Sequence, residues 1–162
     1  MQPRVLSLAL TALLLGLTAC TYDFPLTDRP TRDIDPRLPG DWVATDEDGK
    51  EVPLHVRQYD DSTYVIALDN DLYRAFHTDF AGIAFVSVQN LQSGSLGRKY
   101  TYFRWQLSAD GAQLTLQSIN TEIVPEDTPD RAALQALIKA NLTNPKLYNE
   151  ALTFARPAAP TL

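Results

Sequence analysis

Hydrophobic and polar residues alternate along much of the chain from residue 40 onward. Val52, Leu54 and Val56, for example, are separated by a proline and a histidine and flanked by charged residues. A period of two residues predicts a β-strand with one apolar face. The same alternation recurs at 64–68, 72–80, 103–107 and 114–116, and residues 83–88 form a more continuous apolar run. We therefore expect a protein built mainly from β-strands.

Short polar turns separate these runs. Asp-Gly pairs stand at 48–49 and 110–111, and an Asp-Asn pair stands at 69–70. Such residues favour the positive φ angles of tight hairpins. Seven or so strands joined by short connections predict an antiparallel meander. A meander of that size curls, because strand twist accumulates and closure hides the edges of the sheet.

The hydrophobic period changes from two to 3.6 residues near position 129. One face of the resulting helix carries Leu134, Leu137, Ile138 and Leu142. Thr128 is the expected N-cap and Pro129 the first helical residue, which predicts a helix over about 129–142. A last strand is expected at 151–156. We expect the aliphatic face of the helix to fill the concave side of the sheet and to leave no cavity there.

The first nineteen residues have the composition of a secretory signal. Arg4 provides a positive charge, and residues 5–17 are apolar but fewer than the ~20 that a membrane-spanning helix needs. Cys20, the single cysteine of the chain, follows directly after this signal. The alternative interpretation is a coincidental cysteine in an ordinary signal peptide or in a buried apolar helix.

Residues 17–20, Leu-Thr-Ala-Cys, resemble the lipobox of bacterial lipoproteins. The resemblance implies cleavage before Cys20, a diacylglycerol on its thiol and, usually, an acylated new amino terminus. Two or more acyl chains hold a protein stably on a bilayer. Thr21 and Tyr22 follow without the Asp that retains lipoproteins in the inner membrane. In a host with two membranes the outer one is therefore favoured, and its periplasmic and external faces both stay open.

Residues 20–39 contain four prolines among charged residues and lack apolar periodicity. This composition predicts an extended tether between the membrane anchor and the folded domain. The alternative is that Tyr22 and Phe24 pack across the domain. A single β domain is expected over 40–156, followed by a short tail at 157–162.

Gly40-Asp41-Trp42 begins the expected β domain. A Gly-x-Trp at the start of the first strand resembles the lipocalin pattern, in which the tryptophan closes the barrel floor and a late arginine packs on its ring. The resemblance gives that role to Arg156, and a guanidinium over a buried indole is stabilising. It implies a lipocalin-like half-barrel over 40–156, packed on one C-terminal helix that here precedes the last strand. A ligand cavity is not expected to carry over.

The charge and cysteine content of the chain argue against several kinds of partner. Fourteen Lys and Arg against 20 Asp and Glu give a net charge of −6 at pH 7. Binding to nucleic acid or through a polybasic membrane patch needs clustered Lys and Arg, so the acidic balance disfavours both. A single cysteine disfavours disulfides and structural zinc. We expect no cofactor and no metal.

Several polar residues are candidates for catalytic, metal-binding or anion-binding sites. His55 and His77 lie on the polar side of their runs, which predicts exposed side chains without a nucleophile to serve. Turn carboxylates such as Asp69 lack the EF-hand spacing and are explained by turn geometry. Residues 93–99 form either an anion-binding nest or a flexible hairpin loop, and the loop is favoured. Asn141 begins a glycosylation sequon that has no meaning in a bacterial lipoprotein.

Aromatic residues gather in the expected strands. They are Tyr64, Tyr73, Phe76, Phe80, Phe85, Tyr100, Tyr102, Phe103 and Trp105. They either fill the core or line a pocket for an apolar ligand. Core packing is favoured because the helix is expected to occupy the interior of the sheet.

Three functional hypotheses follow from these expectations. The favoured one is a non-enzymatic interaction module, anchored to the membrane through Cys20, that binds another envelope protein or the cell wall. The second is a lipocalin-type carrier of a lipid or small apolar ligand. An enzyme ranks last, because the residues assemble no nucleophile, metal set or acid–base pair.

Overall fold

The computed structural model describes residues 21–46, 48–92 and 98–158 of the chain. The predicted signal peptide and Cys20 lie outside the described residues. The strands are β1 (Gly40–Thr45), β2 (Glu51–Gln58), β3 (Thr63–Leu68), β4 (Asp71–His77), β5 (Phe85–Asn90), β6 (Tyr100–Leu107), β7 (Gln113–Ser118) and β8 (Leu152–Ala155). Within this part of the chain the helices are α2 (Arg131–Ala140) and the short 3₁₀ helix η1 (Pro145–Leu147).

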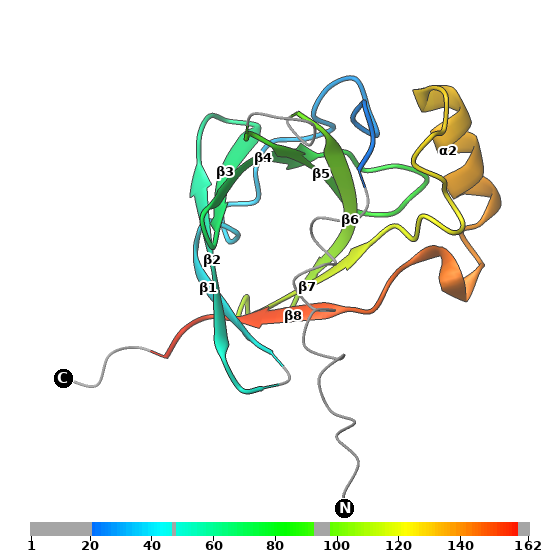
Figure 1. Ribbon diagram of the computed structural model, residues 1–162. Coiled ribbons are helices and arrows are strands. Elements are labelled where there is room, and N and C mark those ends of the chain that lie inside the picture. The colour runs from blue at the N-terminus through cyan, green and yellow to red at the C-terminus, as the bar shows by residue number, and fades with distance from the viewer. Residues whose placement is uncertain (1–20, 47, 93–97, 159–162) are drawn as a thin grey trace, which may run out of the picture.

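The eight strands form a closed antiparallel barrel (Figure 1). Each strand pairs with the next one in the sequence, and β8 pairs with both β7 and β1, where Val43 lies opposite Ala155. The predicted mainly β fold, an antiparallel meander with a helix before its last strand, is confirmed. The sheet closes further than the expected half-barrel because β8 joins its two edges.

The alternation along the strands separates the inside of the barrel from the outside. In β2, Leu54 and Val56 are buried, whereas His55 and Arg57 are exposed. Inward side chains of this kind form the main core cluster. It contains Leu38, Trp42, Ala44, Leu54, Val56, Tyr64, Leu68, Tyr73, Ala75, Trp105, Leu114 and Phe154. The period of two therefore reports the inner face of the barrel correctly in β2.

Helix α2 lies outside the ring of strands, as Figure 1 shows. A second core cluster surrounds the helix and includes outward side chains of β5 and β6. It contains Tyr22, Leu26, Phe85, Tyr102, Ile119, Val124, Leu134, Ile138 and Leu147. The expectation that the helix fills the concave side of the sheet is therefore wrong. Strand β6 shows the reason, because it has apolar residues on both faces. Phe103 faces the interior of the barrel, and Tyr102 lies on the outer face. Tyr102 is fully buried there because it packs in the same cluster as the helix.

The helix is also shorter than the predicted 129–142. Asp130 is the N-cap in place of Thr128, and its carboxylate accepts a hydrogen bond from the Ala133 backbone N–H at 2.8 Å. The Thr128 hydroxyl donates instead to the Pro125 carbonyl. Asn141 is the C-cap, so the helix ends before Leu142. A free side-chain acceptor next to the first turn decides where the helix begins.

The segment that precedes β1 packs on the barrel. Tyr22 and Leu26 are almost completely buried, and Tyr22 exchanges two backbone hydrogen bonds with Tyr100 at the start of β6. Phe24 is partly buried in the same cluster. The predicted tether over 20–39 is therefore wrong for the described residues, and the alternative of packing through Tyr22 and Phe24 is found. Burial of these aromatic rings outweighs the extended preference of the prolines.

The later part of this segment covers one end of the barrel. We call this end, where β1 begins, the base, and the opposite end the rim. At the base the Ile34 N–H donates to the carbonyl of Asp61, in the β2–β3 turn, at 2.9 Å. Leu38 and Ile34 pack against the interior cluster. The base is therefore lined by side chains from the segment as well as from the strands.

Candidate functional site

The base of the barrel brings together the three residues on which the lipocalin resemblance rests. Trp42 is completely buried, and its indole N–H donates to the Leu38 carbonyl at 2.9 Å. The guanidinium carbon of Arg156 lies 3.7 Å from the centroid of the Trp42 ring. Arg156 follows β8, so this stacking joins the last strand to the first.

Gly40 makes room for that stacking. Its φ of +135° lies in the region that favours glycine. A Cβ at this position would lie 2.3 Å from Nη1 of Arg156. The same guanidinium donates to the carbonyls of Pro39, at 3.3 Å, and Arg37. Gly40 therefore allows the arginine to fasten the preceding segment to the barrel.

The interior of the barrel contains a cavity of about 90 Å³. Most of its lining is apolar and comes from strands β2 to β7. Representative lining residues are Leu54, Ile66, Tyr73, Val88, Phe103 and Leu116. The expectation of a filled interior is wrong because helix α2 packs against the outer face of the barrel and leaves the interior free. The aromatic residues divide in the same way, since Phe103 lines the cavity while Phe85 lies beneath the helix.

His77 lies inside the barrel at the base, where the sequence predicts an exposed side chain. It is 0 % exposed and lines the cavity. In β4 the buried inner face is Tyr73, Ala75 and His77, while Leu72 on the other face is 51 % exposed. Apolar residues occur on both faces of this strand, so alternation alone indicated the wrong one. Sequence reasoning therefore missed the histidine of the site.

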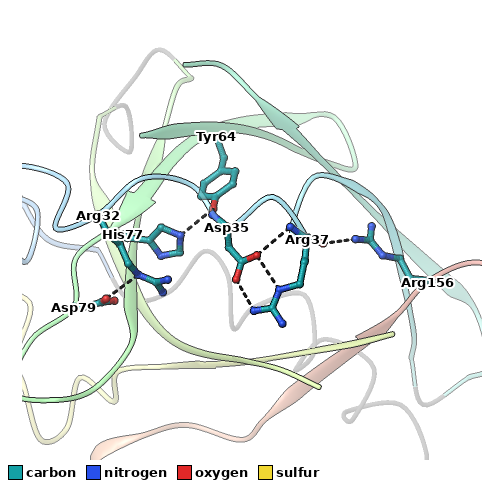
Figure 2. Close-up of polar contacts among 7 residues, drawn as sticks. All are labelled: Arg32, Asp35, Arg37, Tyr64, His77, Asp79 and Arg156. Atoms are coloured by element: carbon teal, nitrogen blue, oxygen red, sulfur yellow. Dashed lines mark hydrogen bonds and ion pairs between the residues drawn. The ribbon is translucent and has the colours of Figure 1, made fainter. Parts of the chain in front are cut away.

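A buried hydrogen-bond chain connects His77 to the segment before β1 (Figure 2). The Asp35 backbone N–H donates to the Tyr64 hydroxyl at 2.6 Å, and that hydroxyl lies 2.8 Å from Nε2 of His77. Burial, together with the nearby Arg32 guanidinium, lowers the pKa of His77 to about 4. Burial also raises the pKa of Tyr64 to about 12. Both side chains are therefore neutral at pH 7.

Two ion pairs flank this chain (Figure 2). Nε of Arg32 lies 2.8 Å from Oδ2 of Asp79, and the guanidinium of Arg32 lies over the Trp105 ring, 5.1 Å from its centroid. Arg37 pairs with Asp35 at 2.7 Å, and its hydrogen bond holds the pKa of the Asp35 carboxyl below its ordinary value. The four charged side chains that flank the His77–Tyr64 chain are thus paired with each other.

The other titratable candidates lie at the surface. His55 is exposed on β2, and its Nδ1 lies 2.9 Å from Oδ1 of Asp41. The hydrogen bonds from His55 and Arg57 lower the pKa of Asp41. Asp46 accepts from the backbone N–H groups of its own turn. No cluster of three or more His, Cys, Asp or Glu side chains suited to a metal occurs in the described residues.

The remaining sequence candidates lie away from the base. Of residues 93–99, 93–97 lie outside the described residues. Lys99 lines the rim side of the cavity and pairs with Asp23. The Asn141 side chain donates to the Leu137 carbonyl at 2.9 Å, closing the end of α2. None of these contacts joins the cluster around His77.

Comparison with protein-family models, with curated proteins and with solved structures finds no significant match to this chain. Across the described residues, no helix combines the length and the apolar character that crossing a membrane requires. Function is therefore inferred from the cavity and its surroundings.

Proposed function

We propose that this protein is a non-enzymatic, lipid-anchored protein of the bacterial envelope whose barrel binds a small apolar molecule. The observation that carries the proposal is the apolar cavity inside the barrel. Protein interiors are close-packed and contain few voids larger than a water molecule, so an apolar space of this size suggests a binding site. Apolar cavities inside proteins bind small hydrophobic guests.

The dimensions of the cavity limit the ligand. Pockets for drug-sized ligands measure roughly 300–1,000 Å³, whereas this one measures about 90 Å³. Its lining extends from Leu38 at the base to Asn90 at the rim. A slim molecule that lies along the barrel axis fits this space better than a bulky ring system.

The predicted lipid anchor would hold the barrel close to the membrane. Tyr22 is 1 % exposed in the core that covers β6. One residue, Thr21, lies between Tyr22 and Cys20, and each of the two steps along the chain spans at most ~3.6 Å. The lipidated residue would therefore stand within about 7 Å of the packed segment. Such closeness suits exchange of an apolar ligand with the bilayer.

The interaction module, the favoured hypothesis from sequence, has weaker support. Among the described residues, the large hydrophobic side chains that are well exposed are Tyr59, Leu72 and Leu91. Tyr59 follows β2 at the base, whereas Leu72 and Leu91 lie at the rim. Residues at opposite ends of the barrel do not make one continuous apolar patch for a partner.

Native mass spectrometry of the protein purified from membranes tests the proposal. We expect a bound mass that is lost on denaturation, which separates it from acyl chains attached to Cys20. Leu54→Trp, which adds bulk inside the cavity, should abolish that mass. Leu72→Trp adds the same ring on the exposed outer face and should retain it.

The absence of a bound mass, together with no uptake from a bacterial lipid extract, would contradict the carrier function. Crosslinking of the same preparation to one specific envelope protein would then favour the interaction module.

A further inference from the structure

Two buried nitrogen atoms have no hydrogen-bond partner among the described residues, and both belong to side chains that line the cavity. They are Nδ1 of His77 and Nε1 of Trp105. The side chains are 0 % and 7 % exposed, and both line the cavity. Their ring centroids lie 5.2 Å apart. Buried polar groups in folded proteins nearly always have a partner, so two neighbouring exceptions need an explanation.

The hydrogen bonds of Tyr64 determine which ring nitrogen of His77 carries the hydrogen. The Tyr64 oxygen already accepts from the Asp35 backbone N–H. Its own proton finds an acceptor in Nε2 of His77, 2.8 Å away. With Nε2 accepting, the neutral imidazole carries its hydrogen on Nδ1. The indole Nε1 of Trp105 is always a donor. Both unpartnered atoms are therefore N–H donors.

We propose that the cavity binds a slim apolar molecule with an uncharged carbonyl group at its inner end, and that the His77 Nδ1–H and Trp105 Nε1–H groups donate to that carbonyl oxygen. Ketones, aldehydes and esters share this chemistry. The inference rests on the proposed ligand-binding function and names the class of ligand. An apolar tail would extend along the aliphatic lining toward the rim.

The charges around the two donors favour an uncharged acceptor over a carboxylate. Arg32, the cation over the Trp105 ring, is paired with Asp79 at 2.8 Å. Asp35, at the other end of the Tyr64 chain, is paired with Arg37. An anion beside His77 would enter a buried site without a free cation, which is costly.

Binding of 2-hexanone, n-hexane and hexanoate tests the inference. The protein is the chain from residue 20 onward, which keeps every described residue, with Cys20→Ser so that no acyl chain competes for the cavity. We expect 2-hexanone to bind about tenfold tighter than hexane, because the hydrogen bonds add to the same apolar burial. Hexanoate should bind more weakly than the ketone.

Nuclear magnetic resonance supplies a direct readout of the contact. The chain has two tryptophans, and the Trp42 indole N–H already donates to Leu38. The ketone should move the Trp105 indole N–H signal downfield and leave the Trp42 signal in place. Hexane should move neither signal downfield.

Trp105→Phe keeps an aromatic ring and removes one donor. The preference for ketone over hexane, measured on the same variant, should fall to about threefold or less. His55→Phe, on the outer surface of β2, is the matched control and should keep the full preference. The wild-type indole signal decides the matter if Trp105→Phe does not fold.

Equal binding of ketone and hexane, or an unmoved Trp105 signal in the ketone complex, would overturn this inference and leave the proposed function standing. Tighter binding of hexanoate would overturn the uncharged acceptor. Failure of all three compounds to bind would overturn both the inference and the proposed function.

Discussion

The burial of His77 makes the stability of the barrel depend on pH. Its pKa lies at about 4 in the folded protein, below the ordinary 6.5. Above pH 6.5 the imidazole is neutral in both states, and its full contribution to stability is present. As the pH falls from 6.5 to about 4, His77 becomes protonated in the unfolded chain but stays neutral in the folded protein. Stability is therefore lost in this window.

We expect the free energy of unfolding to fall by about 3 kcal/mol between pH 7 and pH 4 through this histidine. Urea unfolding at several pH values measures the effect. His77→Phe should remove most of the slope, and His55→Phe should keep it. The carboxyl groups with lowered pKa, such as Asp35, start from 3.8 and lose their contribution at lower pH. An equal slope in wild type and His77→Phe would contradict this account.

The contact between Gly40 and Arg156 predicts non-additive substitutions. Gly40→Ala should destabilise the protein by about 1–3 kcal/mol, because it combines an unfavourable φ with a clash against the guanidinium. Arg156→Ala should cost about 1–2 kcal/mol through the lost contact with Trp42. In the double variant the clash is absent, so the combined cost should be smaller than the sum. Thermal or urea unfolding of the four proteins checks this, and simple additivity would argue against the contact.

At this scale the sequence predicts the residues with a recognisable motif and misses those defined by packing. Trp42 and Arg156 stand out because Gly-x-Trp near a first strand is a local pattern. His77 does not stand out, because its face of β4 is decided by the tertiary arrangement of Tyr73 and Ala75. The unpartnered donors on His77 and Trp105 can be identified only from the folded structure, because the lack of a partner depends on which residues surround them.

Among the elements, helix α2 is predicted in part: local sequence indicates that the helix forms, and tertiary packing decides where it lies. Its existence follows from the period of 3.6 residues, but its position does not follow from that period. An aliphatic stripe fits the inside of a half-barrel as well as the outside of a closed one. The buried Tyr102 on the outer face of β6 decides between them. The sequence predicts a tether before β1 for a similar reason, since the prolines of this segment outnumber the aromatic rings that hold it against the barrel.

Substitution in the helix tests its position. Leu134 is completely buried between α2 and the outer face of the barrel. Leu134→Ala should lower the free energy of unfolding by about 2–5 kcal/mol. Because the helix lies outside, the variant should bind 2-hexanone with unchanged affinity. Calorimetric unfolding and ligand titration measure the two effects. A variant that gains or loses ligand affinity more than about threefold would place the helix in the binding site.

For the whole molecule, the anchor is a proposal from the sequence and has its own test. Inhibition of the lipoprotein signal peptidase should cause a heavier precursor to accumulate. Cys20→Ser should abolish palmitate labelling and release the protein from membranes. A membrane-bound, palmitate-labelled Cys20→Ser protein would contradict the anchor. The barrel fold and the proposed ligand binding do not depend on this result.

The closed barrel, its cavity and the packed segment before β1 together form one folded unit, and we propose that this unit binds the ligand. The sequence predicts the class of this fold because strand alternation and turn residues are local signals. It does not predict closure, because closure depends on β8 pairing with strands at both ends of the meander. The cavity could not be predicted for the same reason, since it exists only when the sheet closes without the helix inside.

The central claim is that the interior of the barrel accepts an apolar guest. A crystal structure under xenon pressure tests it most directly, because xenon enters apolar cavities without needing a hydrogen bond. We expect xenon density inside the barrel, in contact with Leu54, Tyr73 and Phe103. Density absent from the interior, with side chains closed over that space, would contradict it.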